Sequence, residues 1–183
     1  MIRAFIAIAL PEEIKDSIQD IVSGLREKNP AVRWVRPEGM HLTLKFLGNI
    51  DESFVETLSL GLDDVVAQYS CLKLTLSRLG VFPNVRRPRI VWIGLTGNIE
   101  NLSHLAGSID ALSFQFGIER ERREFKSHIT LGRLKVPTMV DLGIEFTQET
   151  FTATQVLLFQ SKLSSQGARY SVLHRSVMMP KGG

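Results

Sequence analysis

The sequence has little cysteine: Cys71 is the only one among 183 residues. A lone cysteine cannot form an internal disulfide, and it rules out a zinc site built from cysteine pairs. A chain of this size without disulfides is typical of a reducing compartment, so we expect a cytoplasmic protein.

Long hydrophobic runs are also missing. No stretch approaches the roughly 18 uninterrupted apolar residues of a membrane helix, so we expect no membrane partner. The apolar start, residues 1–11, carries an early arginine, but its apolar run is too short for a signal peptide. We interpret it as a buried strand.

Neither sign of charge dominates. The 22 basic and 19 acidic residues leave a net charge of +3, which permits an anionic partner but does not predict a protein that coats nucleic acid. Hydrophobic residues make up 44% and charged residues 22%, which is ordinary for a globular protein and excludes disorder and fibres. The length is sufficient to bury a sizeable core.

One short pattern occurs twice. His-Leu-Thr-Leu at 41–44 returns 87 positions later as His-Ile-Thr-Leu at 128–131. Successive side chains of a strand point to opposite faces, so the histidine and threonine of each copy share one face above an apolar floor. If the two strands lie side by side, four side chains converge in a cradle for one phosphate: His41, Thr43, His128 and Thr130.

Hydrophobic periodicity predicts an α+β chain. The expected helices lie between Pro11 and Asn29, from an Asp51 cap to Val66, and from about Ile99 to Phe116 with Gly117 at the end. Besides the two motifs, strands are expected over residues 2–9, 32–36, 72–76 leading into 79–83, 90–95, 156–159 and 170–173, the last two joined by a turn at 164–167. The order suggests two related halves within one bilobal domain, residues 1–183, with residues 180–183 as a loose tail.

The motifs stand in a recognisable context: Arg-Ala-Phe-Ile-Ala-Ile at 3–8, Phe-Leu-Gly at 46–48 and Gly-Val-Phe-Pro at 80–83. Together they resemble the RNA 2′,3′-cyclic phosphodiesterase family, historically called 2′-5′ RNA ligase or LigT-like, within the two-histidine phosphoesterases. The resemblance runs from residue 2 to about 134. A single His-x-Thr-x would be weak, whereas two ordered copies in this context are a specific signal.

This resemblance implies a fold and a reaction. The fold would have two lobes of antiparallel sheet related by a pseudo-twofold axis, with helices outside and the active site in the groove between them. The reaction would be hydrolysis of RNA 2′,3′-cyclic phosphate ends to 2′-phosphomonoesters by a monomer without metal or nucleotide cofactor. Its substrates would be RNA ends, such as tRNA fragments, or small cyclic nucleotides. His41 would be the proton donor and His128 the proton acceptor.

The chemistry of the residues is compatible with these roles. In-line attack on a cyclic phosphate needs a base on the entering side, an acid on the leaving side and donors to the equatorial oxygens. Imidazoles titrate near neutrality and can act as both acid and base. The Thr43 and Thr130 hydroxyls can donate to the phosphate oxygens.

Two further positions have conflicting indications. Phe46 and Arg133 each lie five residues after a motif histidine, and strict alternation would turn both away from the phosphate. The family pattern instead implies that Arg133 binds phosphate and that Phe46 stacks on a base. A bulge at Gly132 could re-aim Arg133. Alternation would point Lys45 into the cleft, although a solvated lysine is an equal alternative.

Other interpretations stay open. The loop Arg86-Arg87-Pro88-Arg89 either follows an RNA backbone or is solvated surface. The arginines at 120, 122 and 123 alternate with glutamates and indicate solvated surface. Paired histidines could bind zinc, but no third ligand is apparent, and His104 and His174 are expected to be bystanders. The alternative functions are reversible 2′-5′ RNA ligation at the same site, or a non-catalytic module that binds RNA ends.

Overall fold

The computed structural model describes residues 1–180. These residues form three α-helices, α1 (Glu12–Lys28), α2 (Phe54–Val66) and α3 (Ile99–Phe114), and a short 3-10 helix, η1 (Pro37–Gly39), between the second and third strands. The strands are β1 (Ile2–Ala9), β2 (Arg33–Trp34), β3 (His41–Ile50), β4 (Leu72–Phe82), β5 (Ile90–Gly97), β6 (His128–Arg133), β7 (Thr150–Ala153), β8 (Gln155–Ser164) and β9 (Gly167–Val177).

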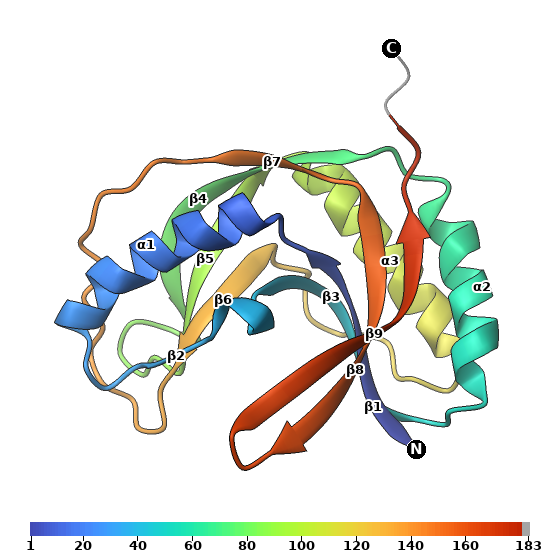
Figure 1. The fold of residues 1–183 in the computed structure, drawn as a ribbon, viewed down its shortest axis with the longest axis horizontal. Coiled ribbons are helices and arrows are strands. Elements are labelled where there is room, and N and C mark those ends of the chain that lie inside the picture. Colours follow the sequence, from blue (N-terminus) through green and yellow to red (C-terminus); the bar gives the residue numbers. More distant parts are fainter. Residues whose placement is uncertain (181–183) are drawn as a thin grey trace.

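The strands form two antiparallel sheets (Figure 1). Sheet A has the order β3-β1-β8-β9, and sheet B has the order β2-β6-β5-β4-β7. The first motif lies on β3 at an edge of sheet A, and the second lies on β6 inside sheet B. Each sheet therefore carries one copy of the motif.

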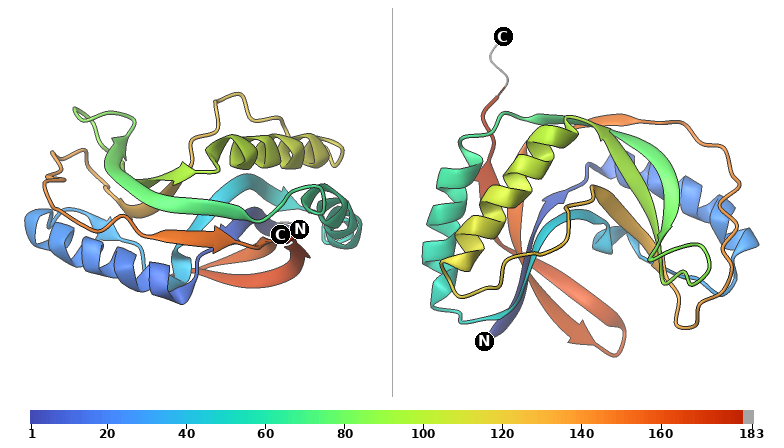
Figure 2. Two further views of the ribbon diagram at one scale, coloured as in Figure 1. Left: turned by 90° about the horizontal axis from the view of Figure 1, so that it is seen from above. Right: turned by 180° about the vertical axis from the view of Figure 1, so that it is seen from behind.

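The helices divide between the sheets. Helices α2 and α3 lie together beside sheet A, where α2 contacts β9 and α3 contacts β3, while α1 lies beside sheet B (Figures 1 and 2). We call sheet A with α2 and α3 lobe A, and sheet B with α1 lobe B. The predicted bilobal α+β fold is confirmed, but neither lobe is a half of the sequence, because the chain crosses repeatedly between the lobes.

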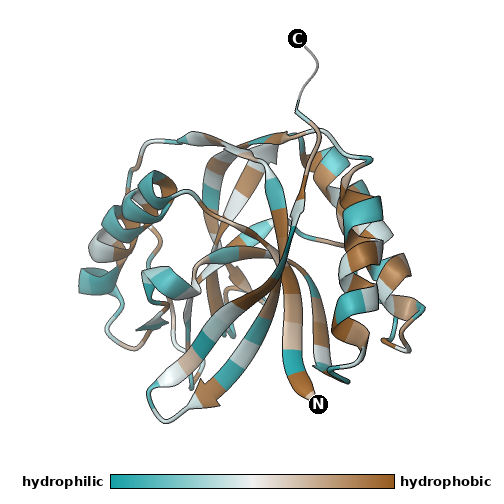
Figure 3. Cartoon of the chain, turned by 45° about the vertical axis from the view of Figure 1, so that its right-hand side comes forward, coloured by the Kyte–Doolittle hydropathy of each residue, from teal (hydrophilic) through white to brown (hydrophobic). Residues whose placement is uncertain are grey.

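The core follows the predicted apolar stripes, which are visible as hydrophobic and hydrophilic sides of the helices in Figure 3. Helix α1 buries Ile14, Ile18, Ile21, Val22 and Leu25, the face expected from its spacing. Burying one such side chain contributes about 1.5–3 kcal/mol. Helix α1 has no side-chain cap; instead the Pro11 carbonyl accepts the N–H groups of Ile14 and Lys15. Apolar burial therefore contributes more than capping to holding this helix.

Some boundaries differ from the expectations. Strand β2 has only two residues, β7 was not predicted, and the β8–β9 hairpin is much longer than the predicted pair. Gly117 and Gly167 adopt positive φ angles of 78° and 114°, which suits the turns at these two points. Residues 181–183 of the predicted tail lie outside the described residues. Within residues 1–180, no helix combines the length and apolar character needed to cross a membrane.

Candidate active site

Strand β3 does not alternate strictly. His41 is opposite Ala9 and Thr43 is opposite Ala7 on β1, but Phe46 is opposite Phe5, because the register shifts once between Thr43 and Lys45; a second shift follows Phe46. Each shift inserts one extra residue and swaps the faces that follow. Phe46 consequently shares the face of His41 and Thr43, and it is 66% exposed.

The expectation from alternation is therefore wrong at two neighbouring residues. Phe46 is not a core residue, and Lys45 does not point into the cleft. Lys45 is buried on the opposite face, where its Nζ donates to Asp110 Oδ1 at 2.6 Å and to the Glu119 carbonyl at 2.7 Å. The cause is the extra residue before Lys45, at Leu44.

Strand β6 has a similar irregularity. His128 is opposite Gly94 and Thr130 is opposite Trp92, after which a register shift places Arg133 opposite Ile90. Since Ile90, Trp92 and Gly94 share one face of β5, Arg133 returns to the face of the motif. The shift lies beside Gly132, where a Cβ atom would come within 2.4 Å of Val32 Cγ1.

The two motif strands meet although they belong to different sheets. Strands β3 and β6 contact each other without pairing. The helices of lobe A lie against the face of sheet A opposite His41, since Asp63 on α2 binds His174 and Ser176 of β9 there. Helices α2 and α3 therefore leave the motif face of sheet A uncovered, and the two motif strands meet at the junction of the lobes.

Aromatic rings surround His41. Phe5 stacks on its ring at a centroid distance of 4.7 Å, and Tyr170 meets it edge-on at 5.3 Å. Burial among these rings, followed by the charge of Lys15, lowers the pKa of His41 from 6.5 to about 4. Sequence reasoning missed Phe5; its only signal is that it shares a face with Ala7 and Ala9 on the strand that pairs with the motif strand.

A backbone carbonyl orients His128. Its Nδ1 lies 2.6 Å from the Lys126 carbonyl oxygen. A carbonyl only accepts, so Nδ1 carries the hydrogen and Nε2 of the neutral ring keeps a free lone pair. Burial, with the charges of Arg133 and Lys126, lowers the pKa of His128, and the hydrogen bond to the carbonyl of Lys126 opposes this only in part. Phe82 packs edge-on against the ring at 5.0 Å.

The remaining histidines lie elsewhere. His174 Nε2 pairs with Asp63 Oδ1 at 2.8 Å on the helix-covered face of sheet A, and His104 is exposed on α3. Among residues 1–180, no three His, Cys, Asp or Glu side chains gather as a metal-binding group. The motif faces of β3 and β6 together carry two imidazoles, two hydroxyls and one guanidinium, residue types suited to proton transfer around a phosphate.

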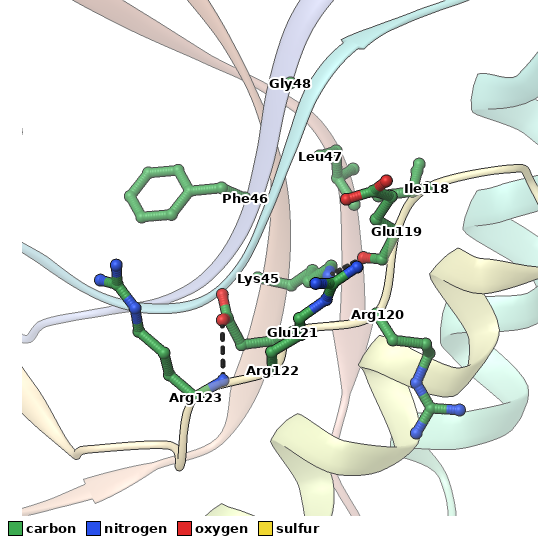
Figure 4. Close-up of a pocket in the computed structure, with 10 residues that line it drawn as sticks. All are labelled: Lys45, Phe46, Leu47, Gly48, Ile118, Glu119, Arg120, Glu121, Arg122 and Arg123. Atoms are coloured by element: carbon green, nitrogen blue, oxygen red, sulfur yellow. Dashed lines mark hydrogen bonds between the residues drawn. The ribbon is translucent and has the colours of Figure 1, made fainter.

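A groove adjoins the site at the end of β3. It has a volume of about 570 Å³ and runs between Phe46 on β3 and the segment 118–123 (Figure 4). Phe46 and Arg123 project toward the same open side, whereas Arg120 extends toward α3 and binds Asp110 (Figure 4). Phe46 is thus an exposed wall of this groove.

Two lobes that each carry a His-x-Thr strand, with the two strands in contact where the lobes meet, are the arrangement expected of a two-histidine phosphoesterase. The model of the LigT-like phosphoesterase family matches this chain twice, over residues 8–92 and 93–170, and each segment contains one motif. The chain belongs to this family.

Similar proteins support the assignment over nearly the whole length. An RNA 2′,3′-cyclic phosphodiesterase of Methanothermobacter thermautotrophicus is 32% identical over 177 residues, covering 93% of this chain and 95% of the relative. A protein of the same name from Archaeoglobus fulgidus is 31% identical over 182 residues, covering 98% and 94%. Among solved structures, E. coli LigT in complex with 3′-AMP has a TM-score of 0.81 at 27% identity and covers 97% of this chain and 98% of its own.

Proposed function

We propose that this protein hydrolyses 2′,3′-cyclic phosphates at RNA ends to 2′-phosphomonoesters, with His41 and His128 transferring the protons. The observation that carries the proposal is the pair of imidazoles on β3 and β6 at the junction of the lobes. The names of the relatives supply the substrate: they are RNA 2′,3′-cyclic phosphodiesterases, and a related structure was solved with 3′-AMP.

His128 would act as the base. Its Nδ1–H is held by the Lys126 carbonyl, which leaves Nε2 as the acceptor. A lowered pKa keeps this ring neutral at pH 7, as a proton acceptor requires. Nε2 would take a proton from water while the water oxygen forms a bond to phosphorus.

His41 would act as the acid, and the substrate itself would make this role available. With a pKa of about 4, its ring is neutral at pH 7 in the empty cleft. A phosphodiester anion beside it favours the imidazolium and raises the pKa. The protonated ring would then donate to O3′ as the bond from phosphorus to O3′ breaks, which yields a 3′-hydroxyl and a 2′-phosphate.

Thr43, Thr130 and Arg133 would bind the phosphate oxygens, since all three lie on the motif faces. Each preorganised donor to a developing charge is worth about 3–4 kcal/mol by analogy with oxyanion holes. Phe46, exposed on the same face as His41, would stack on the base of the terminal nucleotide.

The first prediction concerns the two histidines. In EDTA, RNA with a 2′,3′-cyclic end should be converted to the 2′-phosphate by wild type, and His41→Ala and His128→Ala should each lower kcat by about 10²–10⁴-fold. Phosphorus NMR identifies the product. His104→Ala, which removes an exposed histidine outside the cleft, is the matched control. Unchanged turnover in both cleft variants would contradict the mechanism, and RNA binding without product would favour a non-catalytic module.

A further inference from the structure

Six basic side chains gather at one end of sheet B. We call them the basic rim: Arg33, Arg86, Arg87, Arg89, Arg133 and Lys135. They come from three segments that are distant in the sequence, namely β2, the β4–β5 loop and the end of β6. All six are exposed.

The sheet register brings these segments together. Arg33 is directly opposite Arg133 on β6, and Arg133 is opposite Ile90, which follows Arg89. Beyond the strands, Leu134 N–H donates to the Arg89 carbonyl at 2.9 Å, and Arg89 Nη1 donates to the Lys135 carbonyl at 2.5 Å. The β4–β5 loop and the segment after β6 lie side by side in both views (Figures 1 and 2).

Acidic residues are absent from these segments. Residues 30–37, 83–98 and 125–140 contain no Asp or Glu, and no ion pair among residues 1–180 involves a rim side chain. The whole chain has 22 basic and 19 acidic residues, so without these six the acidic residues would be in excess. The six residues of the rim, out of 22 basic residues in the chain, thus lie on segments that carry no acidic residue.

The basic rim begins on the motif face of β6. Arg133, its inner member, lies on the face of His128 and Thr130, and its charge lowers the pKa of His128. From there the rim leads outward to Arg86 and Arg87 at the tip of the β4–β5 loop. A polyanion whose end occupies the cleft can thus follow positive charge from the site to the surface.

We propose that the basic rim binds the phosphates of the RNA strand on the 5′ side of the cyclised nucleotide. This inference rests on the proposed function, which places the 3′ end of an RNA in the cleft. It predicts that the enzyme prefers RNA ends over small cyclic nucleotides, because only a longer strand reaches Arg86 and Arg87.

The groove beside Phe46 is the competing route for the strand. Its arginines lie among acidic groups: Arg120 binds Asp110, and Glu121 accepts the backbone N–H of Arg123. Glu119 also lines this groove. The balance of charge at the groove favours the rim as the site of the phosphates.

Arg86 and Arg87 allow a clean test. Asn84 Oδ1 holds the loop by accepting their backbone N–H groups at 3.0 and 3.1 Å, so their side chains can be removed without loss of these bonds. Arg86→Ala/Arg87→Ala is compared with Arg122→Ala/Arg123→Ala, which removes the same charge from the competing groove.

Two substrates distinguish a loss of binding at the rim from a loss of catalysis. They are 2′,3′-cyclic AMP and a ten-nucleotide single-stranded RNA with a 2′,3′-cyclic end. The rim variant should lose several-fold in kcat/KM on the RNA and retain wild-type turnover of cyclic AMP, and the groove variant should resemble wild type on both. The slope of log K for RNA binding against log salt should become shallower by about 1.4 in the rim variant, since each contact with single-stranded RNA contributes about 0.7.

Equal losses in both variants, or unchanged RNA binding in the rim variant, would overturn the proposal. RNA binding is also measured by fluorescence anisotropy, which needs no turnover. If wild type cleaves neither substrate, the proposed function fails; the binding data then decide independently whether the rim holds RNA.

Discussion

The burial of His41 links the folding stability of this protein to pH. Below pH 6.5 an unfolded chain protonates His41, whereas the folded chain resists protonation until about pH 4. The unfolded state therefore binds more protons in this window, and the free energy of unfolding decreases as the pH falls from 6.5 to about 4. His128, whose pKa is also lowered, acts in the same direction.

We expect the titration of His41 alone to lower the free energy of unfolding of wild type by up to about 3 kcal/mol when the pH falls from 7 to 4. His41→Gln removes the titrating ring, so this variant should lose less stability over the same range. Urea unfolding at pH 7 and at pH 4.5 measures the difference. An acid-induced loss as large as that of wild type would show that His41 is not shielded as described.

At the scale of elements, a buried ion pair joins β3 to α3. Lys45 Nζ lies 2.6 Å from Asp110 Oδ1, and Arg120 binds the other carboxylate oxygen. Burial alone would raise the pKa of Asp110, but the hydrogen bonds from Lys45, the Glu121 N–H and Arg120 lower it instead. The carboxylate thus remains charged and fixes the segment 119–121 against the strand that carries His41.

Removing one partner of the Lys45–Asp110 ion pair should lower the stability of the fold strongly. Lys45→Met leaves Asp110 buried with one cation fewer, and we expect a loss of about 3–5 kcal/mol in unfolding free energy. Lys45→Met/Asp110→Asn removes both charges and should recover part of the loss. A thermodynamic cycle from urea titrations gives the coupling, and simple additivity of the two substitutions would contradict a direct interaction.

The sequence predicts where helices and strands lie better than it predicts which face of a strand each side chain occupies. Apolar spacing located the three helices and the two motif strands, because a buried stripe repeats regularly along a helix or strand. The bulge at Leu44 in β3 has no such signature, so alternation predicts the wrong face for Lys45 and Phe46, whereas the bulge in β6 lies beside Gly132, where a glycine marks it. Strand β7, four residues long, is too short to give a period, and the aromatic wall around His41 depends on pairing between β1, β3 and β8 that one sequence does not specify.

At the scale of the whole molecule, the two lobes should unfold together. The chain enters lobe A with β1, lobe B with α1 and β2, lobe A again with β3 and α2, and continues to alternate up to β9. Separating the lobes would require crossing segments to unfold. The segments 8–92 and 93–170 are therefore not expected to fold independently, although each matches the family model.

Tryptophan fluorescence and circular dichroism can test whether the two lobes unfold together. Trp34 and Trp92 both lie in sheet B, so tryptophan fluorescence reports on lobe B. Far-UV circular dichroism is sensitive to all the helices, two of which belong to lobe A. The two urea transitions should coincide. Separate midpoints would mean that the lobes are independent folding units.

The stacking of Phe5 on His41 also has a spectroscopic consequence. The carbon-bound protons of the His41 imidazole lie near the face of an aromatic ring at a centroid distance of 4.7 Å, so the ring current should move their NMR resonances upfield. The chain has only four histidines, and His104 is an exposed internal reference. The protonation of His41 can therefore be followed as one resolved signal while a phosphate ligand is added.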